Sequence, residues 1–282
     1  MKFSRLLLGT VQFGLAYGIA NTQGKPSFER VKAILKTALD NGITSLDTAA
    51  AYGDSEEVLG KALADLGIAD RMTIVSKVPP LPADQDPLTF ITDSVTNSLR
   101  RLRLPVIPLI LFHNELDWRW HEELSTLIDK GMIGAAGVSL DSLDCVGTAD
   151  EASYVQLPCN VFDHRFDEKI KAHKSGRIFI RSVYLQGLAV MPKEKIPFPE
   201  LLAYREKLEG FGMPMQELCF RYLLSFPGDV SVLTGVDTPE QLLENCRMAE
   251  AGPLPSDLFE KVSQTVPLLP ERLIRPKLWN RN

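Results

Sequence analysis

Four side chains with complementary acid–base chemistry lie near the ends of three consecutive apolar segments. They are Asp47, Tyr52, Lys77 and His113. A lysine at the inner end of an apolar strand is costly unless an opposite charge compensates it, and Asp47 is the natural partner. Taken singly, each residue has an ordinary explanation, such as an ion pair, a loop aromatic or a hydrogen-bonded histidine. Their occurrence at successive segment ends predicts a common catalytic site.

The chemistry that suits this set is the reduction of a carbonyl group. A hydride that arrives at a carbonyl carbon leaves negative charge on the oxygen, which must be protonated or stabilised. The phenol of Tyr52 has an ordinary pKa of about 10, and a neighbouring Lys77 ammonium is predicted to lower it. Asp47 would hold Lys77 charged and in place, and a neutral His113 would donate a second hydrogen bond to the oxygen. No side chain can supply hydride, so a reduced nicotinamide is required.

The elements that position these residues alternate regularly along the chain. In 28–41, for example, Val31, Ile34 and Leu35 recur at helical spacing, and Gly42 follows as a stop signal. The predicted strands are 5–9, 43–48, 72–78, 106–112, 133–139, 154–157, 177–183 and 230–234. The predicted helices are 28–41, 55–64, 87–102, 122–130, 140–149, 164–173, 200–209, 215–225, 239–249 and 257–266.

Eight strand–helix units predict an α/β fold, specifically a (β/α)8 TIM barrel that forms a single domain over residues 1–282. The open, doubly wound alternative needs a GxGxxG turn after an early strand. The first predicted strand instead leads into Gly9-Thr10-Val11-Gln12-Phe13-Gly14. In such a barrel the active site lies at the carboxyl ends of the strands, where the four candidates are expected to meet.

Composition narrows the class of protein. The 31 basic and 36 acidic residues give a net charge of −5, which argues against a nucleic-acid partner. No apolar stretch reaches the roughly 18–20 residues that span a bilayer, and no leader is visible, so a cytoplasmic protein without a membrane partner is expected. The four cysteines lack metal-site spacing, and of the four histidines only His113 is well placed, so no metal is expected.

The sequence resembles the aldo-keto reductase family over essentially the whole chain. The segments that carry the resemblance are Gly9-Thr10, Leu46-Asp47-Thr48-Ala49 with Tyr52-Gly53, Ile74-Val75-Ser76-Lys77 and Leu111-Phe112-His113. The resemblance implies an (α/β)8 barrel, a nicotinamide cofactor bound in extended form, the tetrad Asp47, Tyr52, Lys77 and His113, and a small-molecule carbonyl substrate. A monomer is expected.

The resemblance also implies a set of cofactor-binding residues. Around the nicotinamide these are Gly9, Thr10, Asp47, Ser139 and Gln156. A loop over the pyrophosphate corresponds to Arg181, Ser182 and Gly187, with Arg181 where the family has an aromatic that stacks on the nicotinamide. The adenosine end corresponds to Gly235, Gln241, Glu244 and Asn245. NADPH is the expected cofactor, with NADH as the alternative because Gly235 and Gln241 lack the usual positive charge.

Two other functions fit parts of the pattern. Lys77 could form a Schiff base in a lyase or aldolase, although this leaves Tyr52 without a role. A catalytically idle nicotinamide-binding redox sensor would need only the cofactor groove. For the substrate pocket, loop residues are the candidates, and Arg165 and Arg181 could meet a phosphate or carboxylate. The apolar and amide candidates are Gln12, Phe13, Tyr17, Trp118, Trp120, Phe162, Leu278 and Trp279.

Overall fold

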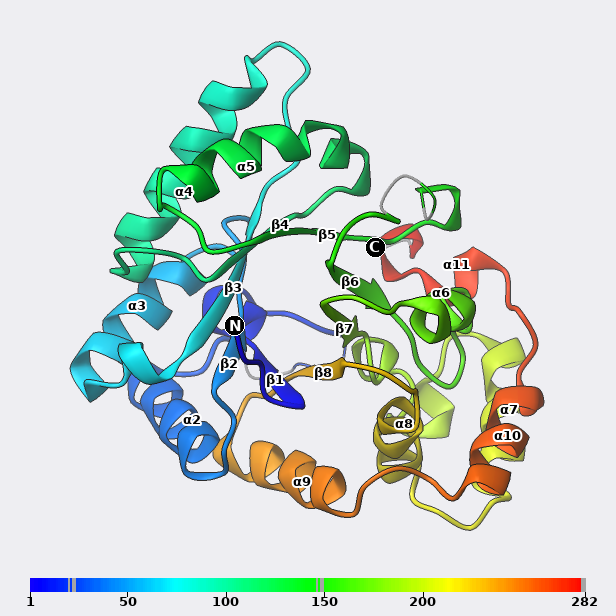
Figure 1. Cartoon of the computed structure of the whole chain (residues 1–282). Coiled ribbons are helices and arrows are strands. Elements are labelled where there is room, and N and C mark those ends of the chain that lie inside the picture. Colours follow the sequence, from blue (N-terminus) through cyan, green and yellow to red (C-terminus); the bar gives the residue numbers. More distant parts are fainter. Residues whose placement is uncertain (20, 22–23, 146, 148–149, 280–282) are drawn as a thin grey trace.

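Eight parallel strands close into a barrel in the order β1 to β8, and the helices surround it (Figure 1). This computed structural model describes residues 1–19, 21, 24–145, 147 and 150–279. The strands are β1 (Leu6–Gly9), β2 (Ser45–Asp47), β3 (Thr73–Val78), β4 (Leu109–Phe112), β5 (Ala136–Ser139), β6 (Tyr154–Pro158), β7 (Arg177–Arg181) and β8 (Val230–Gly235). The predicted (β/α)8 barrel is confirmed.

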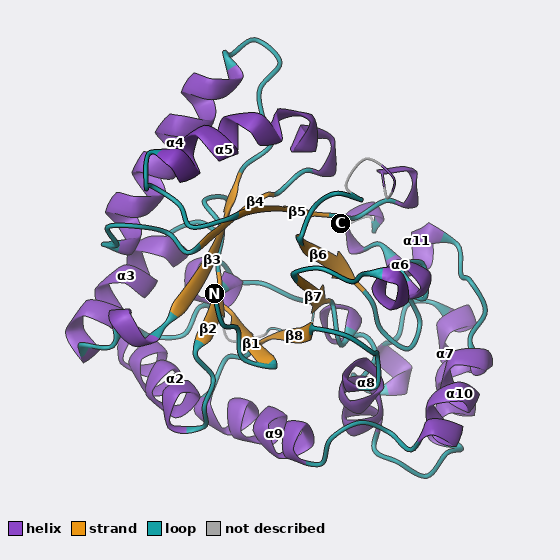
Figure 2. Cartoon of the chain, viewed as in Figure 1, coloured by secondary structure: helices purple, strands orange, loops and turns teal. Residues whose placement is uncertain are grey.

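The helices form an outer layer around the strands (Figure 2). They are α1 (Val11–Gly14), α2 (Phe28–Asp40), α3 (Ser55–Leu66), α4 (Pro87–Leu102), α5 (His121–Asp129), α6 (Asp167–Ala172), α7 (Pro199–Glu209), α8 (Met215–Leu224), α9 (Pro239–Glu250), α10 (Ser256–Thr265) and α11 (Glu271–Ile274). No helix among the described residues is long and apolar enough to cross a membrane.

Local sequence signals explain where the long helices begin. The Asp86 side chain accepts a hydrogen bond from the Thr89 amide at the start of α4, and Pro87 occupies the first turn, where its missing N–H costs nothing. The Thr238 hydroxyl caps α9 in the same way, again followed by a proline. These caps place the amino ends of the helices directly after the loops that leave the strands.

Two apolar layers form on either side of the strands. Leu7, Val75, Leu109, Leu111 and Phe179 fill the barrel interior, while alternate residues such as Leu6 and Leu8 pack outward against the helices. This alternation follows from the two-residue repeat of a strand. Each such buried side chain contributes about 1.5–3 kcal/mol to folding. The interior layer therefore fills the barrel beneath the carboxyl ends of the strands.

The predicted helix 140–149 is wrong where the structure describes it. Residues Leu143–Cys145 form a short 3-10 turn (η3), and residues 146, 148 and 149 lie outside the described residues. The Ser142 hydroxyl accepts from the Asp144 amide, and the Glu115 carboxylate accepts from the Asp141 and Ser142 amides. Side chains of this kind compete with the helical hydrogen bonds and favour turns. The predicted helix 164–173 is shorter than expected, as α6.

Candidate active site

Strand register brings the predicted catalytic residues to one end of the barrel. Gly9 pairs with Asp47 across β1 and β2, and Lys77 pairs with Leu111 across β3 and β4. The loop after β2 continues the pairing, because the Thr48 amide donates to the Val75 carbonyl. The loop that carries Tyr52 packs against Gly14, where an added Cβ would lie 1.8 Å from the Tyr52 carbonyl oxygen. Only glycine allows this close approach.

Lys77 lies at the centre of a buried polar network. Its Nζ donates to both carboxylate oxygens of Asp47 and to the Thr48 carbonyl, each at 2.8 Å, and lies 3.4 Å from the Tyr52 hydroxyl. The Lys77 and Asp47 side chains are 0% and 3% exposed. The Gln156 amide donates to Asp47 Oδ1 at 2.7 Å. The charges therefore compensate each other, and both Lys77 and Asp47 are held by more than one contact.

His113 stands beside Tyr52. Their ring centroids are 5.6 Å apart with an interplanar angle of 85°, and the His113 amide donates to the Val78 carbonyl. Burial, together with the positive charges of Lys77 and Arg181, lowers the pKa of His113 to about 3. The ring is therefore neutral near pH 7, in the state that donates through one nitrogen and accepts through the other.

The sequence-based prediction for the pKa of Tyr52 needs correction. Burial raises the pKa of the phenol above 10.0, and the Lys77 ammonium offsets only part of this rise. For Lys77 itself, burial opposes the charge, but Asp47 and Tyr52 outweigh it and raise the pKa above 10.5. Both groups are consequently protonated near neutral pH, and a protonated phenol is the form that can donate a proton.

A cavity of about 680 Å³ extends from the catalytic residues along the strand ends. Glu244 is the one predicted cofactor-binding residue that does not line it; its side chain is half exposed and pairs with Arg247 at 3.1 Å. The predicted residues that do line the cavity are Gly9, Thr10, Asp47, Ser139, Gln156, Arg181, Ser182, Gly187, Gly235, Gln241 and Asn245. Tyr52 and His113 line it as well, and Lys77 lies beneath it.

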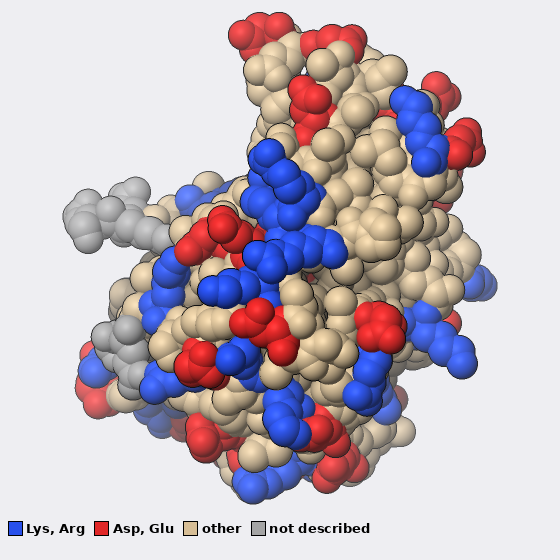
Figure 3. Space-filling model, turned by 90° about the vertical axis from the view of Figure 1, so that its left-hand side faces the viewer, with Lys and Arg blue, Asp and Glu red and all other residues tan. Residues whose placement is uncertain are grey.

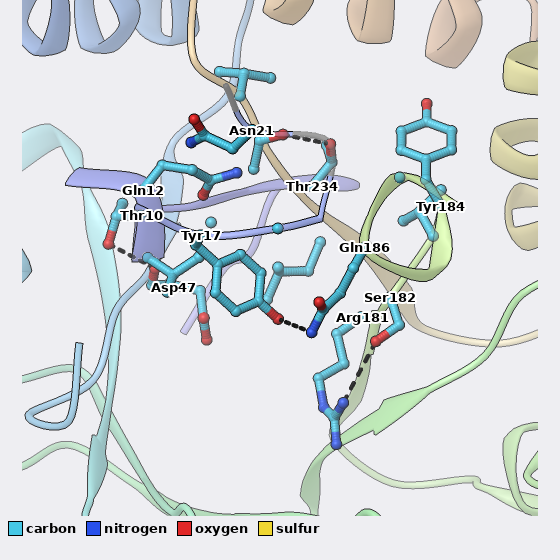
Figure 4. Close-up of a pocket in the computed structure, with 18 of the residues that line it drawn as sticks. Thr10, Gln12, Tyr17, Asn21, Asp47, Arg181, Ser182, Tyr184, Gln186 and Thr234 are labelled. Carbon is cyan, nitrogen blue, oxygen red and sulfur yellow. Dashed lines mark hydrogen bonds between the residues drawn. The ribbon is translucent and has the colours of Figure 1, made fainter. Parts of the chain in front are cut away.

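The loop after β7 forms one wall of this cavity and has unusual backbone geometry. Ser182, Leu185 and Gln186 have φ values of 67°, 47° and 56°, a left-handed region that residues other than glycine rarely adopt. Such strain persists only where the surroundings enforce it, often at functional sites. The Gln186 amide donates to the Tyr17 hydroxyl at 3.2 Å, so the two loops meet across the cavity (Figure 4).

The far end of the cavity lies between β8 and α9. Here Gln241 accepts from the Asp237 amide at 2.7 Å, and Asn245 joins Thr234 and Tyr184 through its side-chain amide. A Cβ on Gly235 would lie 2.4 Å from the end of the Gln12 side chain, so Gln12 packs directly against this wall.

Three buried polar atoms along the cavity have no hydrogen-bond partner among the described residues: Gln12 Oε1, His113 Nδ1 and Asp237 Oδ1. The volume of the cavity, its amide and hydroxyl groups and these unpaired atoms fit a dinucleotide. The assignment of Ser139 and Gln156 to the carboxamide, of Ser182 and Gly187 to the pyrophosphate, and of Asn245 to the adenosine stays a prediction.

Most of the aromatic candidates for the substrate pocket are wrong. Phe13, Trp118 and Phe162 are buried in the core, and neither Trp120 nor Trp279 lines the cavity. The prediction that Arg165 meets an anionic group of the substrate is also wrong, because Arg165 is buried and forms a 2.7 Å ion pair with Asp163. Of these candidates, Gln12, Tyr17 and Arg181 do line the cavity.

Sequence reasoning missed several residues that line the cavity. Asp141 comes two residues after β5, so the rule that strand ends carry function could have found it. Asp237 follows β8 in the same way. Lys277 belongs to the carboxyl-terminal segment, and nothing in the local pattern assigns it to the site.

Comparisons with known proteins agree with the barrel fold and identify the family. The sequence model of the Aldo/keto reductase family matches residues 5–266. Aldo-keto reductase YhdN from Bacillus subtilis is 29% identical over 288 residues, which cover 86% of this chain and 84% of the relative. The solved structure of PA4992, an aldo-keto reductase from Pseudomonas aeruginosa, has a TM-score of 0.68 at 27% identity and covers 88% of this chain and 90% of its own.

A second solved structure, aldo-keto reductase AKR11C1 from Bacillus halodurans in its holo form, has a TM-score of 0.77 at 21% identity. It covers 95% of this chain and 94% of its own, and at that identity the likeness concerns the fold. The family match shows an oxidoreductase of a family that uses a nicotinamide cofactor. The match over nearly the whole chain places the protein in the aldo-keto reductase family.

Proposed function

We propose that this enzyme reduces an aldehyde or ketone to an alcohol, with Tyr52 as the proton donor. The observation that carries the proposal is the position of the Lys77 ammonium, between the Asp47 carboxylate and the Tyr52 hydroxyl. When bound, the reduced nicotinamide supplies the hydride. We propose NADPH as the cofactor, with NADH as the alternative.

The side chains bind the carbonyl oxygen, donate the proton and hold Lys77 in position. The carbonyl oxygen would accept hydrogen bonds from Tyr52 and His113, whose rings stand side by side. The proton moves from the Tyr52 hydroxyl to that oxygen as negative charge develops on it, and the phenolate left behind faces the Lys77 ammonium. Asp47 holds Lys77 in place, and Gln156 donates to Asp47. A neutral His113 orients the substrate without itself carrying charge.

The Schiff-base alternative is less well supported. A lysine must be an unprotonated amine to attack a carbonyl carbon. Asp47 and Tyr52 favour the ammonium form of Lys77, and the Asp47 carboxylate and the Thr48 carbonyl accept from its Nζ. Trapping with borohydride tests this alternative directly, since only a covalent imine with Lys77 would give a stable adduct.

The decisive assay follows the loss of dihydronicotinamide absorbance with NADPH and, separately, NADH, over a panel of short aliphatic, aromatic and sugar aldehydes. Reduction of any panel member without a borohydride adduct supports the proposed function. Tight cofactor binding without turnover over the whole panel would instead favour the idle redox sensor.

A further inference from the structure

Three cations converge on one carboxylate at the rim of the cavity. Asp141 accepts from Arg181 at 3.0 Å through Oδ1 and from Arg275 at 2.9 Å through Oδ2, and Lys277 also pairs with Oδ2. Arg181, Lys277 and Asp141 all line the same cavity as Tyr52 and His113. We call Arg181, Arg275, Lys277 and Asp141 the cationic rim.

Contacts from several parts of the chain hold the cationic rim in place. Arg181 ends β7 and also donates to the Leu140 carbonyl at 3.0 Å. Arg275 pairs with Glu271 one turn earlier and with Asp141, and the pair with Asp141 joins the carboxyl-terminal segment to the loop after β5. Lys277 follows in the 3-10 turn Pro276–Leu278 (η7). The rim is therefore positioned by the fold before any substrate arrives.

The cationic rim carries more positive than negative charge. Glu271 pairs with Arg275 and also with Arg165, and Arg165 has Asp163 as its own partner. The single carboxylate of Asp141 is therefore left to balance Arg181 and Lys277. Glu115 accepts from the backbone amides of Asp141 and Ser142 and does not line the cavity. One positive charge at the cavity rim is thus left for an anion.

The excess charge also faces the reacting groups. Arg181 contributes to lowering the pKa of His113, after burial and Lys77. Lys277 is 55% exposed, so its ammonium can reorient from Asp141 toward a ligand at modest cost. Arg181 and Asp141 are 25% and 23% exposed, and they present partly hydrated groups to the cavity. Tyr52 and three members of the cationic rim line one cavity, so a substrate with its carbonyl at Tyr52 has the rim within the same space.

We infer that the preferred substrates carry an anionic oxygen group, a carboxylate or a phosphate, at the end remote from the reacting carbonyl. This inference rests on the proposed carbonyl reduction. Arg181 and Lys277 bind the anionic group in place of part of their contact with Asp141. Guanidinium and ammonium groups both suit such anions, and the planar guanidinium suits a carboxylate best.

Matched pairs of aldehydes test the inference. Succinic semialdehyde is compared with butanal, and glyceraldehyde 3-phosphate with glyceraldehyde, each by kcat/KM with saturating cofactor. We expect kcat/KM to be at least about 10-fold higher for the anionic member than for the neutral member of one or both pairs. The pair with the larger ratio shows whether the site prefers a carboxylate or a phosphate. The preference should shrink as salt is added, because the attraction is electrostatic. Equal kcat/KM for the anionic and the neutral aldehydes would overturn the inference but would leave the proposed function intact. If no aldehyde of either kind were reduced, the proposed function itself would be wrong.

Variants of the cationic rim should change the anionic-to-neutral ratio of kcat/KM in opposite directions. Lys277→Gln should lower the anionic-to-neutral ratio of kcat/KM by about fivefold, and Lys277→Arg should retain most of it. Asp141→Asn should raise the ratio, because it frees two cations. Lys195→Gln removes an exposed lysine outside the cavity and serves as the matched control. Equal shifts for Lys277→Gln and Lys195→Gln, or a lowered ratio for Asp141→Asn, would contradict the inference.

Discussion

Lys77 Nζ lies 3.4 Å from the Tyr52 hydroxyl, and the same ammonium group donates a hydrogen bond to the Asp47 carboxylate. The two residues come from neighbouring strand ends, and the Ala50 amide joins the loop that carries Tyr52 to β3 by donating to the Lys77 carbonyl at 3.2 Å. The ammonium is thus placed where it stabilises a phenolate, while burial keeps the phenol protonated until a proton acceptor arrives.

Replacement of Lys77 by methionine should damage both catalysis and stability. The Asp47 carboxylate would stay buried without its charge partner, at a cost of about 3–5 kcal/mol in the free energy of unfolding. Turnover should fall by about 100-fold or more, because the phenolate of Tyr52 loses its stabilising charge. Urea unfolding and steady-state assays measure the two effects.

The double variant Lys77→Met with Asp47→Asn separates these effects. Removing both charges should recover a large part of the lost unfolding free energy, since no unpaired charge stays buried. Turnover should stay low. Recovery of turnover alongside stability would show that Lys77 acts only as a structural partner.

His113 should make the fold sensitive to acid. Its pKa is lowered to about 3, against an ordinary value of 6.5 in the unfolded chain. The neutral form therefore stabilises the fold above about pH 6.5, and this contribution is lost progressively as the pH falls toward 3. At about pH 5 the loss amounts to about 2 kcal/mol.

His113→Gln should remove this acid sensitivity. Urea unfolding of the parent and the variant, at about pH 7.5 and about pH 5, gives the difference in unfolding free energy between the two conditions. That difference should be smaller in the variant by about 2 kcal/mol. An equal pH dependence in both proteins would show that His113 is not held neutral by burial.

The pH profile of carbonyl reduction should be set by a protonated Tyr52. Because burial raises the pKa of the phenol above 10.0, the acid form persists over the neutral range. The kcat/KM for reduction should therefore stay level up to about pH 10 and decline above it, as the phenol loses its proton. A decline centred below about pH 8 would mean that Lys77 acidifies the phenol more than burial opposes it.

Gly14→Ala should displace the loop that carries Tyr52. The added Cβ would lie 1.8 Å from the Tyr52 carbonyl oxygen and 2.5 Å from the Ser55 amide, so the backbone must move. Overpacking of this kind costs about 1–3 kcal/mol and should lower turnover along with stability. Gly210→Ala is the matched control, because Gly210 has a helical φ of −60°. Normal turnover in Gly14→Ala would show that Tyr52 tolerates a shifted loop.

The barrel could be predicted from the sequence because it depends on short-range periodicity. The convergence of Asp47, Tyr52, Lys77 and His113 could be predicted because the active site of such a barrel lies at the carboxyl ends of its strands. The segment 140–149 was misjudged because its apolar residues suit a helix, whereas Ser142 and Glu115 bind the backbone amides that a helix would use. Periodicity carries no information about such competing contacts.

Other features depend on long-range packing and could not be predicted from the sequence. The pKa of Tyr52 reflects the balance between burial and one ammonium, and only the packed site sets that balance. Lys277 reaches the cavity through ion pairs of Arg275 with Asp141 and Glu271, which connect distant parts of the chain. Trp118 and Phe162 lie on loops in the sequence but pack into the core.

The most direct test of the account is Tyr52→Phe, measured for cofactor affinity and for turnover on the same preparation. The change removes one hydroxyl from the wall of the cavity and leaves Lys77 its three acceptors on Asp47 and Thr48. Titration of NADPH against protein fluorescence should give an unchanged dissociation constant, while carbonyl reduction falls by about 100-fold or more. Turnover close to that of the parent would contradict the assignment of Tyr52 as the proton donor.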